Sequence, residues 1–271
     1  MSARSASAYL TLARWENGCI AAAGVLFGAW WVGWSGAARS VALAACAAFL
    51  LTAAANAWND RADVAIDRQA HPARPIPSGT VDSTAAGRVA WCCAVAALVM
   101  SALISLLLAL VTAGVVALMY AYSPWLKRSG LPGNIVVAVL ASLPFLYGGW
   151  SAGRAAAALP LVALAVPLHF ARELAKDLDD ATADATVQRL TLPIRSGVRL
   201  TRGVLLVAAA TFVLALLPWA SSVPRFGLAV LPAVLLVMLG AARALRGHRG
   251  SPLVFKMAMV CAMVAFVIIR P

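Results

Sequence analysis

The sequence contains few charged residues. Lys, Arg, Asp and Glu account for 12% of its 271 residues, whereas roughly a quarter is usual in a soluble domain. With 63% hydrophobic side chains and a mean hydropathy of +0.88, this shortage excludes an ordinary soluble globular protein. About 20 apolar residues cross a bilayer, so the chain has room for about nine spans and for no large soluble domain. We therefore expect a single membrane domain over residues 1–271.

Cysteine and acidic residues are also scarce. The five cysteines show no metal-ligand spacing beyond the adjacent pair Cys92 and Cys93, and we interpret them as packing residues. Ten acidic residues stand against 22 basic ones, which gives a net charge of +12. In so apolar a chain the basic excess indicates membrane topology, and we expect no nucleic-acid partner.

Nine apolar stretches predict an all-α, polytopic membrane protein. Residues 89–126 form an uncharged run of 38 residues. As one helix this run would be about 57 Å long, against a hydrocarbon core of about 30 Å, so it must form two helices with a tight turn. The stretches are approximately Cys19–Trp34, Val41–Trp58, Thr84–Ser105, Leu106–Tyr122, Asn134–Trp150, Ala155–Ala171, Gly203–Ala220, Phe226–Leu239 and Leu253–Ile269.

The loops between these stretches differ in charge. Nine spans place the N-terminus and the loops after spans 2, 4, 6 and 8 on one side of the membrane, and that side carries 18 of the 22 basic residues. The positive-inside rule predicts that this side is cytoplasmic. All ten acidic residues lie there too. The rule does not require this second asymmetry, so we attribute it to a functional site.

The first acidic cluster follows the second span. Asn59, Asp63 and Asp67 recur every four residues, so on a helix they share one face at about 6 Å from turn to turn. Like charges at this spacing repel each other, which indicates a shared cation. Oxygen ligands suit Mg²⁺, which proteins hold through one or two carboxylates together with substrate phosphate oxygens.

The second cluster follows the sixth span and repeats the pattern, because Asp180 and Asp184 are four residues apart and Lys176 precedes Asp180 by four. A solvated helix end decorated with charge is the alternative for either cluster, but two such clusters at membrane depth or close to it favour function. If the two clusters face each other across a cytoplasmic cavity, they would bind divalent ions, and the ions would bind a diphosphate. Neutralising the charge of this leaving group lets an allylic carbon–oxygen bond ionise. Neighbouring Arg and Lys side chains would add donors to the phosphate oxygens.

These two motifs resemble the signatures of the UbiA superfamily of intramembrane prenyltransferases. They read Asn59-Asp60-Arg-Ala-Asp63-Val-Ala-Ile-Asp67 and Lys176-Asp177-Leu-Asp179-Asp180-Ala-Thr-Ala-Asp184. The second departs from the family pattern, which often has Glu before Asp and a later Gly. Four further stretches are similar to geranylgeranylglyceryl phosphate geranylgeranyltransferases, also called digeranylgeranylglyceryl phosphate synthases: Leu12–Asn17, Arg74–Gly79, Leu126–Asn134, and Lys256–Met259 with Ala265–Phe266.

The resemblance implies nine helices around a central cavity, a prenyl diphosphate donor, Mg²⁺ and surrounding membrane lipids. The residues implied to bind Mg²⁺ are Asn59, Asp63, Asp67, Asp180 and Asp184, and the four aspartates among them are the expected catalytic residues. The residues expected to bind substrate are Asn59, Asp60, Arg74, Lys127, Arg128, Arg172, Lys176, Asp177, Arg14 and Asn17.

The acceptor is less constrained than the donor. Geranylgeranylglyceryl phosphate brings a dianionic headgroup beside the diphosphate, and this needs the fixed positive charge of residues such as Arg14, Lys127, Arg128 and Arg172. An aromatic acceptor such as 4-hydroxybenzoate, homogentisate or a quinone precursor would leave similar metal motifs. A cation-coupled transporter is disfavoured, because no acidic residue falls in the middle of a predicted span.

Overall fold

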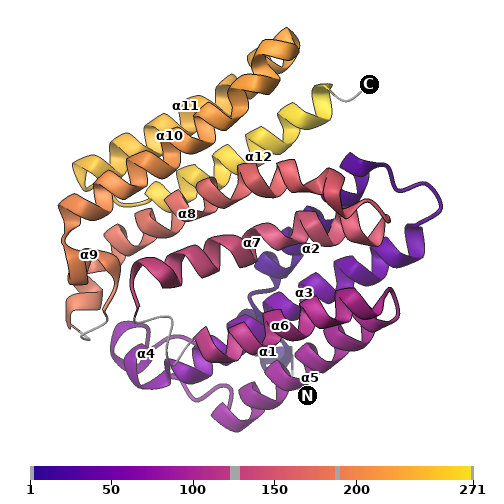
Figure 1. Cartoon of the computed structure of the whole chain (residues 1–271). Helices are drawn as coiled ribbons and strands as arrows, with labels where there is room; N and C mark the ends of the chain where they lie inside the picture. The colour runs from indigo at the N-terminus through magenta and orange to yellow at the C-terminus, as the bar shows by residue number, and fades with distance from the viewer. Residues whose placement is uncertain (1–2, 123–128, 187–189, 270–271) are drawn as a thin grey trace. The chain divides into compact units, whose positions relative to one another are not determined.

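The computed structural model describes residues 3–122, 129–186 and 190–269, and every element in these ranges is a helix. The predicted all-α class is therefore confirmed. The helices are α1 (Ala3–Ala13), α2 (Trp15–Val32), α3 (Ala38–Ala62), α4 (Val64–Ala70), α5 (Ser83–Ala102), α6 (Leu106–Tyr122), α7 (Leu131–Ser151), α8 (Ala155–Thr186), α9 (Leu192–Ser196), α10 (Val198–Ser222), α11 (Pro224–Arg246) and α12 (Ser251–Ile269) (Figure 1).

Seven of these helices are long and apolar enough to cross a membrane, which makes this a multi-pass membrane protein. They are α3, α5, α7, α8, α10, α11 and α12. The two other predicted spans also coincide with helices: α6 is apolar but has only 17 residues, and α2 carries the polar pair Glu16 and Asn17 in its first turn. The number of nine crossings remains a prediction.

The chain divides into two compact units, residues 1–126 with 143–161 and residues 127–142 with 162–271. In the first unit, α3 packs against α2 on one side and α5 on another. Its buried positions are mostly alanine, including Ala44, Ala47 and Ala48. Small side chains let helix backbones approach closely in a membrane. The alanine-rich sequence of α3 therefore fits its central position in this unit.

Helices α2 and α7 approach each other still more closely. A Cβ atom added at Gly28 would lie 2.2 Å from the carbonyl oxygen of Phe145, and one added at Gly148 would lie 2.0 Å from that of Val25. Glycine is required at both positions, because backbone faces backbone there. Gly149 in turn contacts Ala158 of α8, where an added Cβ would lie 2.5 Å from the alanine Cβ.

A buried polar contact joins three helices of the same unit. The Thr112 hydroxyl of α6 lies 2.8 Å from the Ser101 hydroxyl of α5 and 2.6 Å from the Tyr147 hydroxyl of α7. Polar groups within a membrane need such internal partners, because lipid supplies none. In the second unit α11 packs between α10 and α12, with the rings of Phe226 and Phe266 4.7 Å apart.

Candidate active site

The first acidic motif lies at the end of α3. Asp60 comes 22 residues after the first residue of this helix, which is about 33 Å along its axis and matches the hydrocarbon thickness of about 30 Å. Asp63 ends α3 and precedes α4, with φ −90° and ψ 2°. The sequence predicted helical spacing for Asn59, Asp63 and Asp67, and it did not indicate the junction at Asp63.

Helical spacing nevertheless persists through the junction. The amide of Asp63 donates to the carbonyl of Asn59 at 2.9 Å, and the amide of Asp67 donates to the carbonyl of Asp63 at 2.9 Å. The residues Asp60, Asp63 and Asp67 are only 2%, 6% and 1% exposed. Buried carboxylates require ionic or hydrogen-bonding partners, since burying an unpaired charge is very costly. The partners of two of them come from outside the motif.

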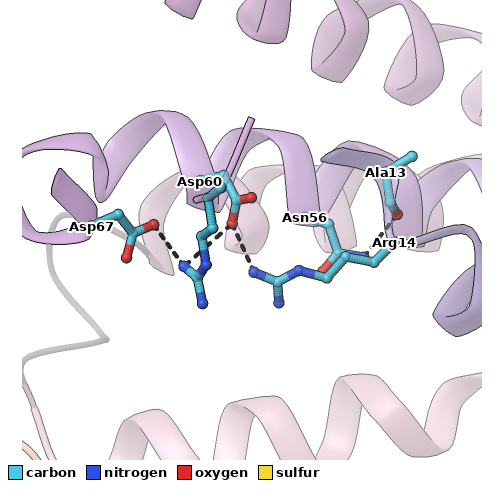
Figure 2. Close-up of polar contacts among 6 residues, drawn as sticks. Ala13, Arg14, Asn56, Asp60 and Asp67 are labelled. Atoms are coloured by element: carbon cyan, nitrogen blue, oxygen red, sulfur yellow. Dashed lines mark hydrogen bonds and ion pairs between the residues drawn. The ribbon is translucent and has the colours of Figure 1, made fainter. Parts of the chain in front are cut away.

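Two arginines supply these partners, and the dashed lines in Figure 2 mark the contacts. Nη2 of Arg14 lies 2.7 Å from Oδ1 of Asp60. Nη1 of Arg74 lies 2.6 Å from Oδ2 of Asp67 and 3.8 Å from Oδ1 of Asp60. The alternating series Arg14, Asp60, Arg74 and Asp67 thus brings together four residues that the sequence assigned to the site.

Arg14 occupies the corner between α1 and α2. It has φ 47° and ψ 59°, and it is the one non-glycine residue with positive φ in the described part of the chain. This left-handed conformation costs an arginine about 1–2 kcal/mol. The corner is fastened by the Asn56 side chain, which donates to the carbonyl of Ala13 at 3.1 Å (Figure 2), and by the Asn17 amide, which donates to the carbonyl of Arg14 at 2.8 Å. Asn17 therefore helps to hold this corner through its backbone N–H group.

The loop between α4 and α5 holds Arg74 in position. Pro75 and Ile76 are buried beside it, and the amide of Ser78 donates to the carbonyl of Arg74 at 2.9 Å. At the end of the loop the carboxylate of Asp82 accepts hydrogen bonds from the first turn of α5, including one from the amide of Thr84 at 2.8 Å. These backbone N–H groups lower the pKa of Asp82 below its usual value.

The second motif lies on α8, a continuous helix of 32 residues. As predicted, Asp180 and Asp184 occupy the same helix, and Asp184 is buried whereas Asp180 is exposed. Asp177 accepts a hydrogen bond of 2.8 Å from the side chain of Asn134 at the start of α7. The side chain of Asp179 accepts one of 2.8 Å from the amide of Gly250, immediately before α12.

The remaining predicted site residues have varied surroundings. Arg172 forms an ion pair with Glu173, and Lys176 is exposed on α8. Lys127 and Arg128 lie outside the described residues. Asn56 and Asn134 were not assigned as partners from the sequence. The only signal for Asn56 was its place four residues before Asp60, and Asn134 appeared merely within a family-like stretch.

The oxygen donors of the first motif fit Mg²⁺. In the part of the chain that the structure describes, no three His, Cys, Asp or Glu side chains gather into a ready ion site. Mg²⁺ usually binds one or two carboxylates and completes its coordination with water and substrate phosphates. The carboxylates of Asp63 and Asp67 and the amide oxygen of Asn59 are hard ligands of this kind.

Comparison with known proteins identifies the family. The sequence profile of the UbiA prenyltransferase family matches residues 10–264. The chain belongs to this family. This UbiA protein is 35% identical to the digeranylgeranylglyceryl phosphate synthase of Methanopyrus kandleri, with 96% of this chain and 97% of the relative covered. It is 37% identical to the enzyme of the same name from Natronomonas pharaonis, with 93% and 92% covered.

Solved structures share the fold. A structure of digeranylgeranylglyceryl phosphate synthase matches with a TM-score of 0.75 and 22% identity, covering 97% of this chain and 98% of that one. An Archaeoglobus fulgidus UbiA homologue bound to DMAPP and Mg²⁺ matches with a TM-score of 0.70 and 15% identity, covering 96% and 99%. The predicted UbiA-type membrane fold is therefore confirmed.

Proposed function

We propose that this UbiA protein transfers a geranylgeranyl group from its diphosphate to geranylgeranylglyceryl phosphate, forming an ether. The observation that carries the proposal is the near full-length similarity, at 35% and 37% identity, to two enzymes named digeranylgeranylglyceryl phosphate synthase. The A. fulgidus UbiA homologue was solved with DMAPP and with GPP, each together with Mg²⁺. These ligands support a prenyl diphosphate as donor and Mg²⁺ as cofactor.

In this proposal the two acidic motifs receive the diphosphate. The residues that would hold Mg²⁺ are Asn59, Asp63, Asp67, Asp180 and Asp184. When bound, Mg²⁺ supplies positive charge to the diphosphate oxygens. Arg74 and Lys176, together with Lys127 and Arg128, would donate hydrogen bonds to the same oxygens, since guanidinium and ammonium groups bind phosphate strongly.

The reaction then follows from charge stabilisation. The bond between C1 of the prenyl group and the diphosphate oxygen breaks, and the electron pair leaves with the diphosphate. The resulting allylic cation is attacked at C1 by the hydroxyl oxygen of the acceptor. The hydroxyl proton passes to a nearby carboxylate or to the departing diphosphate. Fixed donors aimed at the leaving group lower the barrier, because the negative charge develops there in the transition state.

The acceptor proposal depends on the positive charge near the motif. A phosphate headgroup next to a diphosphate needs cationic donors besides the metal. Arg14 suits this role, because its side chain is 34% exposed while one guanidinium nitrogen is held by Asp60. An arginine has five N–H donors. One guanidinium can therefore serve both the buried carboxylate and a phosphate oxygen.

We also propose that the acidic motifs lie on the cytoplasmic side. The proposal is supported by the 18 of 22 basic residues that nine spans would place there. Both substrates would then enter from the cytoplasmic leaflet, with their phosphate groups at the membrane surface and their isoprenoid chains between the apolar helices.

The test is product identification with purified protein in lipid nanodiscs. The protein is incubated with Mg²⁺, geranylgeranyl diphosphate and one of three acceptors: geranylgeranylglyceryl phosphate, 4-hydroxybenzoate or homogentisate. We expect mass spectrometry to find an ether product with the lipid phosphate alone, lost with a chelator and restored by Mg²⁺. A prenylated aromatic product without the lipid product would refute the acceptor. No product with any acceptor would refute prenyl transfer.

A further inference from the structure

Asp60 is held by two arginines from outside the motif. Its side chain is 3% exposed, and a single oxygen, Oδ1, lies 2.7 Å from Arg14 and 3.8 Å from Arg74 (Figure 2). The two arginines come from opposite sides in the sequence, one before α2 and the other after α4. One carboxylate thus connects the α1–α2 corner and the α4–α5 loop to the end of α3.

The charges around Asp60 favour contacts with Arg14 and Arg74 that persist when a metal and a phosphate group bind. Oδ1 of Asp60 lies beside two guanidinium groups, and both oppose the approach of a further cation to that oxygen. Arg74 is shared, because it also contacts Oδ2 of Asp67 at 2.6 Å. If Asp67 ligates a metal, Asp60 would still offer Arg74 an ionic partner. The guanidinium then stays beside the motif, where phosphate oxygens arrive.

The second motif contains the same arrangement. Asp177 follows Lys176 as Asp60 follows Asn59, and in both motifs further aspartates come three and seven residues later. Asp177 is also held by a side chain from another helix, since Asn134 donates to its Oδ2 at 2.8 Å. Both Asp60 and Asp177 come 22 residues after the start of their helix. In each half of the chain, this position has a side-chain partner from outside the motif.

We propose that Asp60 is a positioning residue that holds Arg14 and Arg74 for the phosphate groups of the substrates, and that it does not ligate Mg²⁺. In the second motif, Asp177 likewise positions Asn134. In both motifs, the aspartates three and seven residues later supply the oxygen ligands of Mg²⁺. The identity of the substrates rests on the proposed function. The division of labour among the aspartates rests on the contacts of Asp60 and Asp177.

The test compares Asp60→Asn with Asp63→Asn, two isosteric changes three residues apart. Binding of geranylgeranyl thiolodiphosphate, a donor analogue whose sulfur resists cleavage, is followed by tryptophan fluorescence over a range of Mg²⁺ concentrations. For Asp60→Asn we expect an unchanged Mg²⁺ midpoint and analogue affinity at saturating Mg²⁺ weaker by about tenfold, the loss of a well-placed charged contact. For Asp63→Asn we expect the Mg²⁺ midpoint to rise about tenfold or more.

Two further variants keep the result decisive. Arg74→Gln should reproduce the weaker analogue binding with an unchanged Mg²⁺ midpoint. If Asp60→Asn does not fold, Arg74→Gln takes its place in the comparison. Asp60→Glu retains the charge and should restore part of the affinity. A Mg²⁺ midpoint raised as much in Asp60→Asn as in Asp63→Asn would make Asp60 a ligand and overturn the proposal. Unchanged analogue affinity in Asp60→Asn and Arg74→Gln would overturn it too. Wild-type protein that binds no analogue would instead refute the proposed donor.

Discussion

The close crossing of α2 and α7 allows the effect of a single substitution on stability to be predicted. Gly148→Ala adds one Cβ atom 2.0 Å from the carbonyl oxygen of Val25 and 2.6 Å from the amide nitrogen of Ala29. Both are backbone atoms of a helix, so neither can rotate away as a side chain would. Relief of the clash requires the two helices to separate by roughly 1 Å, which forfeits dispersion contacts along the whole crossing.

Overpacking of this kind costs about 1–3 kcal/mol, and we expect the upper end because the obstacle is backbone. At about 2–4 °C per kcal/mol, the Tm should fall by roughly 6–12 °C. Thermal unfolding in detergent, followed by tryptophan fluorescence, measures the change. Gly114→Ala on α6 is the matched control, because its added Cβ meets nothing within 4 Å. Alanine favours a helix over glycine by about 1 kcal/mol, so the control should keep or raise the Tm. Equal Tm values for both variants would refute the reasoning.

Three further outcomes are expected. Asp63→Asn and Asp180→Asn should each lower turnover by at least about a hundredfold at a nearly unchanged Tm, and near-normal turnover in either would contradict the two-motif site. In a cysteine-free background, a membrane-impermeant thiol reagent added to intact cells should miss Ser78→Cys and label Ala156→Cys, whereas the reverse pattern would invert the topology. Asp82→Ala should lower the Tm at pH 7. Because backbone N–H groups lower the pKa of Asp82 on folding, its contribution is present above about pH 4 and is lost as the pH falls through the lowered pKa. The Tm difference from wild type should therefore narrow in acid, and a difference independent of pH would argue against the cap.

The break between α5 and α6 was predictable because the bilayer fixes the length of one crossing. The uncharged run of 38 residues was too long for one crossing, and the structure ends α5 at Ala102 and begins α6 at Leu106. The break at Asp63 was not predictable in the same way. A spacing of four residues fits a straight helix, but it also fits two helices whose junction keeps the i to i−4 hydrogen bonds, as it does at Asp63 and Asp67.

The residue types of the candidate site could be chosen from the sequence, but their pairwise contacts could not. Repeated carboxylates at helical spacing indicate cation and phosphate chemistry without any knowledge of packing. The contact between Asn134 and Asp177 joins residues 43 positions apart, and no local sequence pattern predicts such a contact. Nor does the sequence mark the left-handed turn at Arg14, where glycine or asparagine would be the usual signal. That conformation is retained because the ion pair with Asp60 and the hydrogen bond from Asn56 hold the corner.

The positions of the acidic residues along α3 and α8 explain how a membrane protein can carry two clusters of charged side chains. An aspartate at the middle of a spanning helix costs about 2.5–3.5 kcal/mol on insertion scales. Asp60 and Asp177 come 22 residues into α3 and α8, which is about 33 Å and therefore beyond the apolar core. The carboxylates thus avoid most of that penalty while remaining next to apolar helix surface. A substrate with an anionic head and an isoprenoid chain needs this boundary, because its two ends require different solvents. The charges that bind the head can therefore be supplied without weakening the spans that accommodate the chain.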